Sequence, residues 1–223
     1  MGKAQLSLPL RNTWGGRRAG AGRKPRNPKR LNVPHRPRLV HKSRYPLHVT
    51  LRCVVRSLRA QQLTAMLMRC FRKAQRADFR IVHYSIQADH LHLIVEAENR
   101  SSLISGMRGL AIRVARLLNP ILFRRGRFWA DRWHSRELTS PRSVRNALVY
   151  VLMNHKKHLR ARGLDPLSSA EWFDGFISLE TAASVEQHAA RPPPVANAQT
   201  WLLGCGWKRR GLIHVNEAPR APN

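Results

Sequence analysis

Two short runs rich in β-branched and aromatic residues, separated only by Ala88 and Asp89, constrain the fold of this chain most strongly. The first is Phe79–Gln87 (FRIVHYSIQ), and the second is His90–Ala97 (HLHLIVEA). Two runs of this composition joined by two residues are typical of a β-hairpin. The sequence therefore predicts an antiparallel sheet that contains this hairpin.

The segments on either side of the hairpin extend the sheet and cover it. Tyr45–Val55 alternates apolar with polar side chains, which is the period of a half-buried strand. Apolar residues at helical spacing predict one helix up to Asp78, with Ser57 as its N-cap. The same spacing predicts a second helix that follows Ser101 and Ser102 and is ended by Asn119-Pro120.

A further strand and helix complete the predicted domain. Arg124–Leu138 mixes β-prone aromatics with arginines, and Thr139 or Ser140 ahead of Pro141 begins a helix that ends at Gly163. The order is therefore β-α-β-β-α-β, an α+β fold with a ferredoxin-like (RRM-like) antiparallel sheet, to which a C-terminal helix is added. Because this fold hosts many functions, the chemistry of particular residues must decide.

Composition divides the chain into three parts. Residues 1–43 are a basic arm of Gly, Pro, Arg and Lys that lacks the apolar residues needed to fold alone. Residues 44–163 form the domain. Residues 164–223 are an extension with a proline run and a basic tail containing two tryptophans, which packs on the domain or contacts a nucleotide.

The charge of the chain predicts a nucleic-acid partner. Lysine and arginine total 41 against 12 acidic residues, giving a formal charge of +29. The basic segments are interrupted by Gly and Pro and lack the apolar face that a membrane-lying helix needs, so DNA is favoured over a membrane. The cations expected to contact DNA are Arg17, Arg18, Arg23, Lys24, Arg124, Arg125, Arg127, Arg132, Lys156 and Lys157.

Trp129, Trp133 and Tyr84 are candidate surfaces for base stacking. Solvated charge and core aromatics are the alternative.

Cysteine usage and the N-terminus indicate the compartment. Cys53, Cys70 and Cys205 are widely spaced and match neither a disulfide framework nor a zinc motif. The first ten residues are too weakly apolar for a signal peptide, and no apolar run approaches membrane-spanning length. We expect a cytoplasmic protein that associates with the nucleoid through DNA binding.

Two histidines stand out in the second run of the hairpin. In a strand, His90, His92 and Glu96 share one face, while the apolar residues between them form the other. Their Cα atoms are about 7 Å apart along the strand, a separation from which both rings can reach one metal ion. Two ligands alone do not make a metal site, and polar surface residues are the alternative.

A third partner is available on the last predicted helix. Its apolar stripe consists of Val144, Leu148, Val151, Leu152 and Leu159. Tyr150 and Asn154 lie off this stripe and one turn apart on a shared face. A phenol near a divalent cation can attack a phosphodiester, and an amide oxygen suits a hard metal. Alternatively, Tyr150 is a boundary aromatic and Asn154 a helix-surface residue.

The combination of "HLH" with the "YVLMN" helix resembles single-tyrosine HUH transposases. The chain is most similar to REP-associated tyrosine transposases, in "GGRRAGAGRKP", "HLHLIVEAE", "GRFWADRWHSR", "VRNALVYVLMNHKKH" and "TWLLGCGW". The resemblance spans about Gly15 to Pro219.

This resemblance implies that His90, His92 and Asn154 hold Mg²⁺ or Mn²⁺ and that Tyr150 is the nucleophile. It further implies attack on single-stranded DNA through a 5′-phosphotyrosine, with hairpin-forming palindromic repeats as substrates. Asn154 stands where some HUH transposases have a glutamine, and its shorter reach makes Glu96 an alternative ligand.

Two other functions remain open from the sequence alone. Ferredoxin-like sheets also bind single strands without chemistry, and His90 with His92 also suits a metal-dependent hydrolase that uses water. The sequence does not decide between a monomer and a homodimer.

Overall fold

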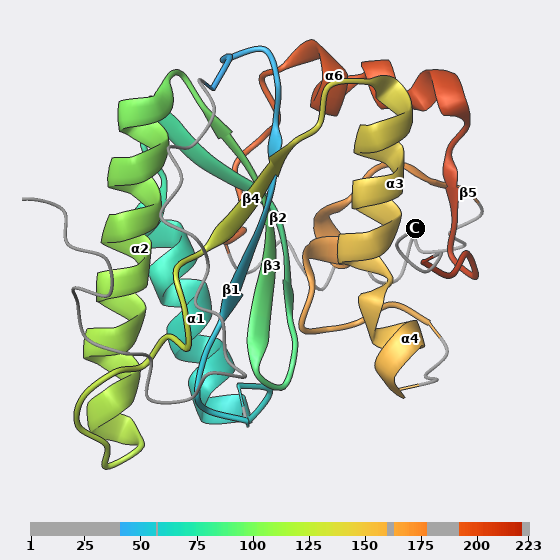
Figure 1. Cartoon of the computed structure of the whole chain (residues 1–223). Coiled ribbons are helices and arrows are strands. Elements are labelled where there is room, and N and C mark those ends of the chain that lie inside the picture. The colour runs from blue at the N-terminus through green and yellow to red at the C-terminus, as the bar shows by residue number, and fades with distance from the viewer. Residues whose placement is uncertain (1–40, 57, 160–162, 178–191, 220–223) are drawn as a thin grey trace, which may run out of the picture. The chain divides into compact units, whose positions relative to one another are not determined.

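A four-stranded antiparallel sheet forms the centre of the molecule (Figure 1). The computed structural model describes residues 41–56, 58–159, 163–177 and 192–219. The strands are β1 (Leu47–Arg52), β2 (Phe79–Ile86), β3 (His90–Ala97) and β4 (His134–Glu137), and they lie in the order β2-β3-β1-β4. The predicted hairpin and the ferredoxin-like α+β fold are therefore confirmed.

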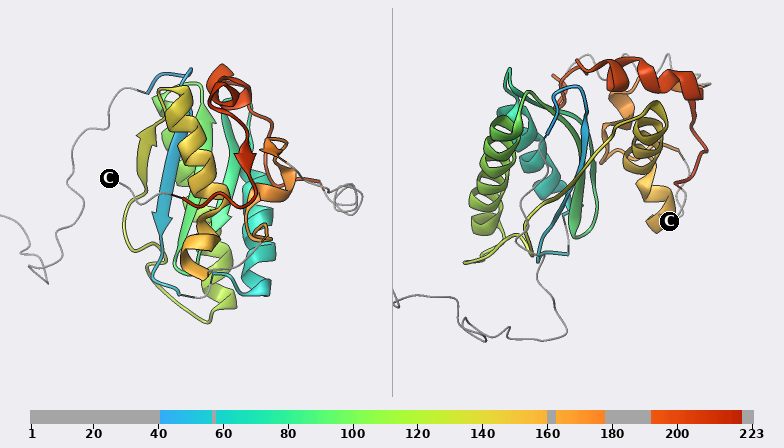
Figure 2. Two further views of the ribbon diagram at one scale, coloured as in Figure 1. Left: turned by 90° about the vertical axis from the view of Figure 1, so that its right-hand side faces the viewer. Right: turned by 45° about the horizontal axis from the view of Figure 1, so that its top comes forward.

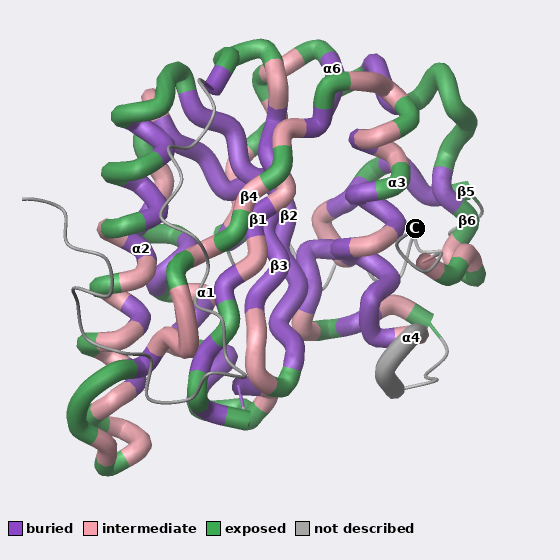
Figure 3. The backbone as a smooth tube through the Cα atoms, in the orientation of Figure 1, coloured by how far each residue is buried: buried purple, intermediate pink, exposed green. Residues whose placement is uncertain are grey.

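Two helices cover one face of this sheet, α1 (Gln61–Ala74) and α2 (Arg100–Ile121). The alternate apolar side chains of β1 and β3 point toward them, including Val49, Leu91 and Leu93, all fully buried. Figure 3 shows the resulting contrast between the buried central strands and the exposed outer side of α2. Burying one face of each strand fixes its register, because a shift by one residue would turn the apolar set away from the helices.

The opposite face of the sheet is covered by α3 (Pro141–Leu152), which packs on β2 and β3 of its own chain. A second apolar cluster lies between them and includes Ile94, Val144 and Leu148. Figure 2 shows α3 and the C-terminal segment lying together over this face. A register shift in β2 between Ile81 and His83 turns Val82 into this cluster.

Several predicted helix boundaries were wrong. The residue before α1 is Ala60, which makes no side-chain cap, and Ser57 lies outside the described residues. The N-cap of α2 is Asn99, whose side chain accepts a hydrogen bond from the Ser102 N–H, so the predicted serines lie inside the helix. Pro120 lies inside α2, and the helix ends one residue later at Ile121, close to the predicted end.

The fourth strand and the third helix are shorter than predicted. The strand is confined to β4, because the chain first turns at the end of α2 and then makes a single bridge between Cys53 and Trp129. Ser140, one of the two predicted starting residues, caps α3 in a reciprocal pair with Ser143. The helix then breaks at Met153, which is fully buried, and α4 (Asn154–Leu159) follows. Burial of this turn against the core overrides continuous helix formation.

The C-terminal segment packs on α3 rather than extending away from it. It contains η1 (Ser169–Trp172), β5 (Phe176–Ile177), α6 (Trp201–Gly204), η2 (Gly206–Arg210) and β6 (Ile213–His214). Trp207 is almost fully buried in the second cluster, and a Cβ atom on Gly175 would lie 2.3 Å from its ring. Residue 175 must therefore be glycine for the tail to pack as it does.

Candidate active site

The register of β1 against β3 places polar side chains beside the two histidines. Thr50 pairs with His92 and Arg52 pairs with His90, so the non-core faces of both strands form one polar surface next to α3. His92 is almost fully buried there, and His90 is half-buried. The alternative of a polar surface residue is wrong for His92, because α3 and the C-terminal segment cover this face.

Four aromatic rings meet at this surface. The ring centroids of His90 and His92 are 4.7 Å apart, and those of His92 and Tyr150 are 4.9 Å apart. His48, from β1, lies 5.5 Å from Tyr150 and 5.2 Å from His92. The structure thus brings together the two histidines and the tyrosine from segments almost sixty residues apart.

Both imidazoles are oriented by partners on their Nδ1 atoms. His90 Nδ1 donates to a carboxylate oxygen of Asp89 at 2.7 Å, and this contact is the largest cause that lowers the pKa of Asp89. His92 Nδ1 lies 3.2 Å from Thr50 Oγ1 and 3.2 Å from His48 Nε2. Metal-binding histidines commonly have a second partner of this kind, which fixes the ring and directs Nε2 to the metal.

The side chain of Asn154 is unusual for a residue at the start of a helix. It is fully buried, and neither its Oδ1 nor its Nδ2 has a hydrogen-bond partner among the described residues. Leaving a buried amide unpaired costs about 1–3 kcal/mol. The alternative of a surface residue is therefore wrong. The Asn154 amide, one turn beyond Tyr150, makes no hydrogen bond among the described residues that would compete with binding a ligand.

These residues fit a divalent cation. The buried amide oxygen is a donor that suits a hard cation such as Mg²⁺ or Mn²⁺. The two imidazoles with oriented Nδ1 atoms are donors for divalent transition metals. Within the part of the chain that the structure describes, no three His, Cys, Asp or Glu side chains gather into a metal site.

Burial shifts the titration of the groups around the site. Burial lowers the pKa of His48 to about 4, and the nearby charges of Arg136 and His134 add to this effect. His48 is therefore neutral at pH 7. Burial also raises the pKa of Tyr150. Its phenol needs a nearby positive charge before it can lose its proton at neutral pH.

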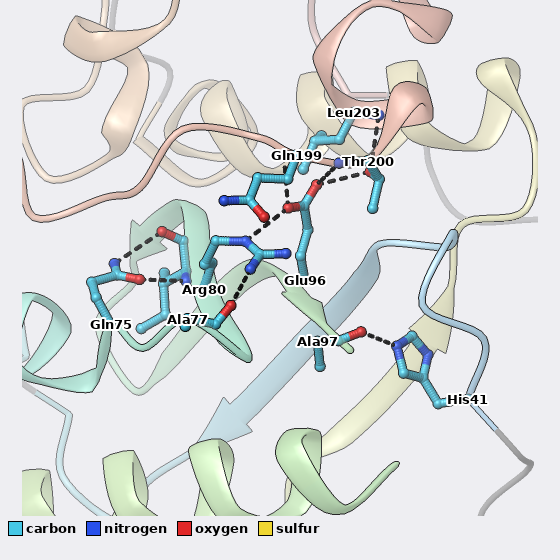
Figure 4. A network of polar contacts seen from close by, with 10 residues as sticks. His41, Gln75, Ala77, Arg80, Glu96, Ala97, Gln199, Thr200 and Leu203 are labelled. Atoms are coloured by element: carbon cyan, nitrogen blue, oxygen red, sulfur yellow. Dashed lines mark hydrogen bonds and ion pairs between the residues drawn. The ribbon is translucent and has the colours of Figure 1, made fainter. Parts of the chain in front are cut away.

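Glu96 has a structural role, so the prediction of an alternative metal ligand was wrong. Its fully buried carboxylate accepts hydrogen bonds from the backbone N–H groups of Gln199 and Thr200, both at 2.9 Å. It also accepts from the Thr200 hydroxyl at 2.8 Å and from Arg80 at 3.2 Å (Figure 4). Both oxygens are occupied, and they hold the C-terminal segment against β3.

The cations proposed to contact DNA differ in their surroundings. Arg17, Arg18, Arg23 and Lys24 lie outside the described residues, as does the side chain of Lys157. Arg124, Arg125 and Arg127 follow α2, and Arg132 is exposed ahead of β4. The guanidinium of Arg127 donates to the carbonyls of Trp129 and Ala130, and Lys156 donates to the Val215 carbonyl. Burial lowers the pKa of Lys156.

The aromatic residues suggested for base stacking belong mainly to the core. Tyr84 is fully buried, which raises the pKa of its phenol, so its assignment as a stacking surface was wrong. Trp129 and Trp133 are partly buried and pack against the α1–α2 side of the sheet. The Trp129 indole also donates to the Ala111 carbonyl at 2.9 Å.

Sequence reasoning missed His48, Thr50 and Asp89 as parts of the site. A signal for them existed. Asp89 directly precedes "HLH", and His48 and Thr50 occupy the polar positions of the first strand. In a ferredoxin-like sheet the first and third strands are neighbours, so their polar faces must meet.

Comparison with known proteins agrees with this fold. A solved structure of a REP-associated tyrosine transposase bound to a REP hairpin matches with a TM-score of 0.52 and 16% sequence identity. The match covers 75% of this chain and 93% of the other. At this identity, the match shows that the two proteins share a fold.

Sequence comparison identifies the family. Residues 41–153, just over half of the 223-residue chain, match the family described as "Transposase IS200 like". The chain belongs to the IS200-like transposase family, whose members process DNA. No curated protein matches the chain. None of the helices in the described residues is long and apolar enough to cross a membrane.

Proposed function

We propose that this protein is a metal-dependent tyrosine transposase that nicks single-stranded DNA and transfers the cut strand. The observation that carries this proposal is the placement of Tyr150 against His92, with His90 beside it and the unpartnered amide of Asn154 one turn further on. A nucleophile next to a set of metal donors is what metal-assisted phosphodiester cleavage requires.

Tyr150 attacks the phosphorus atom of a phosphodiester. Its Oη forms a bond to phosphorus, and the bond from phosphorus to the 3′ oxygen breaks. The products are a 5′-phosphotyrosine and a free 3′-hydroxyl, which takes up a proton. A 3′-hydroxyl that later attacks the phosphotyrosine restores the phenol and joins two strands. The phosphodiester bond energy is conserved in the covalent link, so no nucleotide triphosphate is needed.

His90, His92 and Asn154 would hold the cation, Mg²⁺ or Mn²⁺. When bound, the cation would polarise the scissile phosphate and favour the phenolate form of Tyr150. Burial acts in the opposite direction, because it raises the pKa of Tyr150. Asp89, Thr50 and His48 keep the two imidazoles oriented. Only the neutral form of an imidazole ligates a metal.

The substrates we propose are palindromic repeats that fold into hairpins with single-stranded flanks. This proposal follows from the solved relative, which was bound to a REP hairpin. The formal charge of +29 also favours a polyanionic substrate. A cytoplasmic location near the nucleoid fits that substrate.

The test is a covalent-adduct assay. The full chain is incubated with labelled hairpin DNA and Mn²⁺, and denaturing gels are searched for a protein–DNA adduct that EDTA prevents. Tyr150→Phe should form no adduct and retain DNA affinity, while Tyr45→Phe serves as the matched control with full activity. Cleavage without an adduct would instead indicate a hydrolase that uses water. Binding without any cleavage would indicate a non-catalytic DNA-binding module.

A further inference from the structure

Phe123, directly after α2, is 99% exposed and has a φ angle of 51°. A bulky L-residue seldom adopts a positive φ, because its Cβ crowds the backbone. An aromatic ring that is fully open to water is also unfavourable. The chain therefore accepts two unfavourable features at one residue.

The hydrogen bonds around Phe123 explain its backbone conformation. The Arg124 N–H donates to the Asn119 carbonyl at 2.8 Å, and the Phe123 N–H donates to the Pro120 carbonyl at 3.0 Å. These two bonds define a Schellman motif, in which the left-handed position is normally glycine. The Asn119 amide also donates to the Gly126 carbonyl at 3.0 Å, which closes the turn. Phenylalanine thus occupies a glycine position in a turn that would form more easily without it.

The surroundings of Phe123 are cationic. Arg124, Arg125 and Arg127 follow it within four residues, and the sequence contains no acidic residue from 99 to 130. An exposed aromatic ring between arginines is the combination that stacks on nucleobases while neutralising the adjacent phosphates. The same combination is unsuited to an apolar protein surface.

A groove lies between α1 and α2, and residues 109–117 line it on the α2 side. It has a volume of about 500 Å³ and is lined by Arg69 and Lys73 of α1 and by Arg113 and Arg116 of α2. Among the described residues, none of these four cations takes part in an ion pair. Like charges one helical turn apart repel each other, so the groove favours a bound anion. Arg116 precedes Phe123 by seven residues, or about 10 Å of helix rise.

We propose that Phe123 is a base-stacking residue for DNA whose phosphate backbone follows the groove between α1 and α2. The ring stacks on an unpaired base or enters a kinked base step, and the arginines around it contact the flanking phosphates. This surface covers the face of the sheet opposite α3, so it holds DNA away from Tyr150 (Figure 1). The proposal depends on the proposed function only in taking DNA as the ligand.

Substitution of Phe123 separates this role from a structural one. Phe123→Gly relieves the positive φ and should raise the midpoint of thermal unfolding by about 2–4 °C. The same change should weaken DNA binding between about fivefold and 100-fold, as expected for the loss of one stacked base. Phe123→Trp should keep the affinity. Ile104→Ala, which truncates another exposed apolar residue of α2, is the matched control and should leave the affinity unchanged.

The measurement is fluorescence anisotropy with the full chain and two labelled probes, a mixed-sequence single-stranded 30-mer and a hairpin with single-stranded flanks. The double variant Arg113→Gln/Arg116→Gln should reduce the slope of log affinity against log salt concentration by the equivalent of about two phosphate contacts. The proposal would be overturned if Phe123→Gly bound DNA as tightly as the unchanged protein. It would also be overturned if Phe123→Gly lost self-association and kept its DNA affinity. Because binding is measured without cleavage, a failed adduct assay would leave this result interpretable.

Discussion

The ring of Tyr150 meets the imidazole of His92 edge-on, with centroids 4.9 Å apart and planes at 81°. One residue comes from the end of α3, and the other from the middle of the sheet. Because α3 packs on the sheet of its own chain, Tyr150 and the two histidines lie together without a second subunit. This contact makes the orientation of the two histidines a direct determinant of the proposed chemistry.

Asp89→Asn should lower the affinity for Mn²⁺ by about 10- to 100-fold, because an amide orients the His90 ring less strongly than a carboxylate. Isothermal titration calorimetry with Mn²⁺ measures this without relying on activity. Arg52→Met is the matched control, since it removes the other partner of Asp89 and leaves the contact with His90. Equal Mn²⁺ affinities for Asp89→Asn and the unchanged protein would remove Asp89 from the site.

Asn154→Leu should stabilise the fold and abolish the covalent adduct. The substitution removes a buried amide without hydrogen-bond partners, so we expect the free energy of unfolding to rise by about 1 kcal/mol. Urea denaturation gives the stability, and the adduct assay gives the activity. Asn119→Leu, which breaks the bond to the Gly126 carbonyl, should instead destabilise the protein. A stable Asn154→Leu variant with full activity would exclude the amide as a ligand.

The sequence predicted the fold well because its strands carry a clear period. Alternation in the first strand and in the hairpin placed the core face correctly, and Thr139 or Ser140 ahead of Pro141 located the start of α3. Boundaries that depend on tertiary contacts were missed. The break at Met153 depends on burial, and no local pattern marks it.

The site was predictable in its main residues and not in their surroundings. His90, His92 and Tyr150 were identified from spacing, yet the exposure of their strand face was misjudged. Glu96 shares a face with the histidines, and only the return of residues 199 and 200 to the sheet showed that its oxygens are occupied. A contact between residues about one hundred positions apart leaves no local trace in a single sequence.

Glu96→Gln should destabilise the protein by about 3 kcal/mol, because it leaves the nearly buried guanidinium of Arg80 without its charge partner. We also expect the C-terminal segment to be cut faster in limited proteolysis, since residues 199 and 200 lose their anchor. Glu98→Gln, at an exposed position two residues away, is the control and should change neither. If the double variant Arg80→Met/Glu96→Gln were no more stable than Glu96→Gln alone, the unpaired charge of Arg80 would not be the cause of the lower stability of Glu96→Gln.

The free energy of unfolding should fall as the pH is lowered from about 6.5 to 4, and His83 should contribute to this loss. Burial lowers its pKa from 6.5 to about 4, although the charge of Asp174 acts in the opposite direction. Between these two values the unfolded chain binds a proton that the folded protein does not, so acid favours unfolding. His83 pairs with Ile94 of β3, and its ring contacts Ser169 and the ring of Phe173. Urea denaturation at pH 7 and pH 4.5 measures the effect, and His83→Gln should have a smaller stability difference between the two conditions. His214→Gln, at an exposed position, should keep the full difference. The same pH dependence in His83→Gln and in the unchanged protein would assign the loss to other groups.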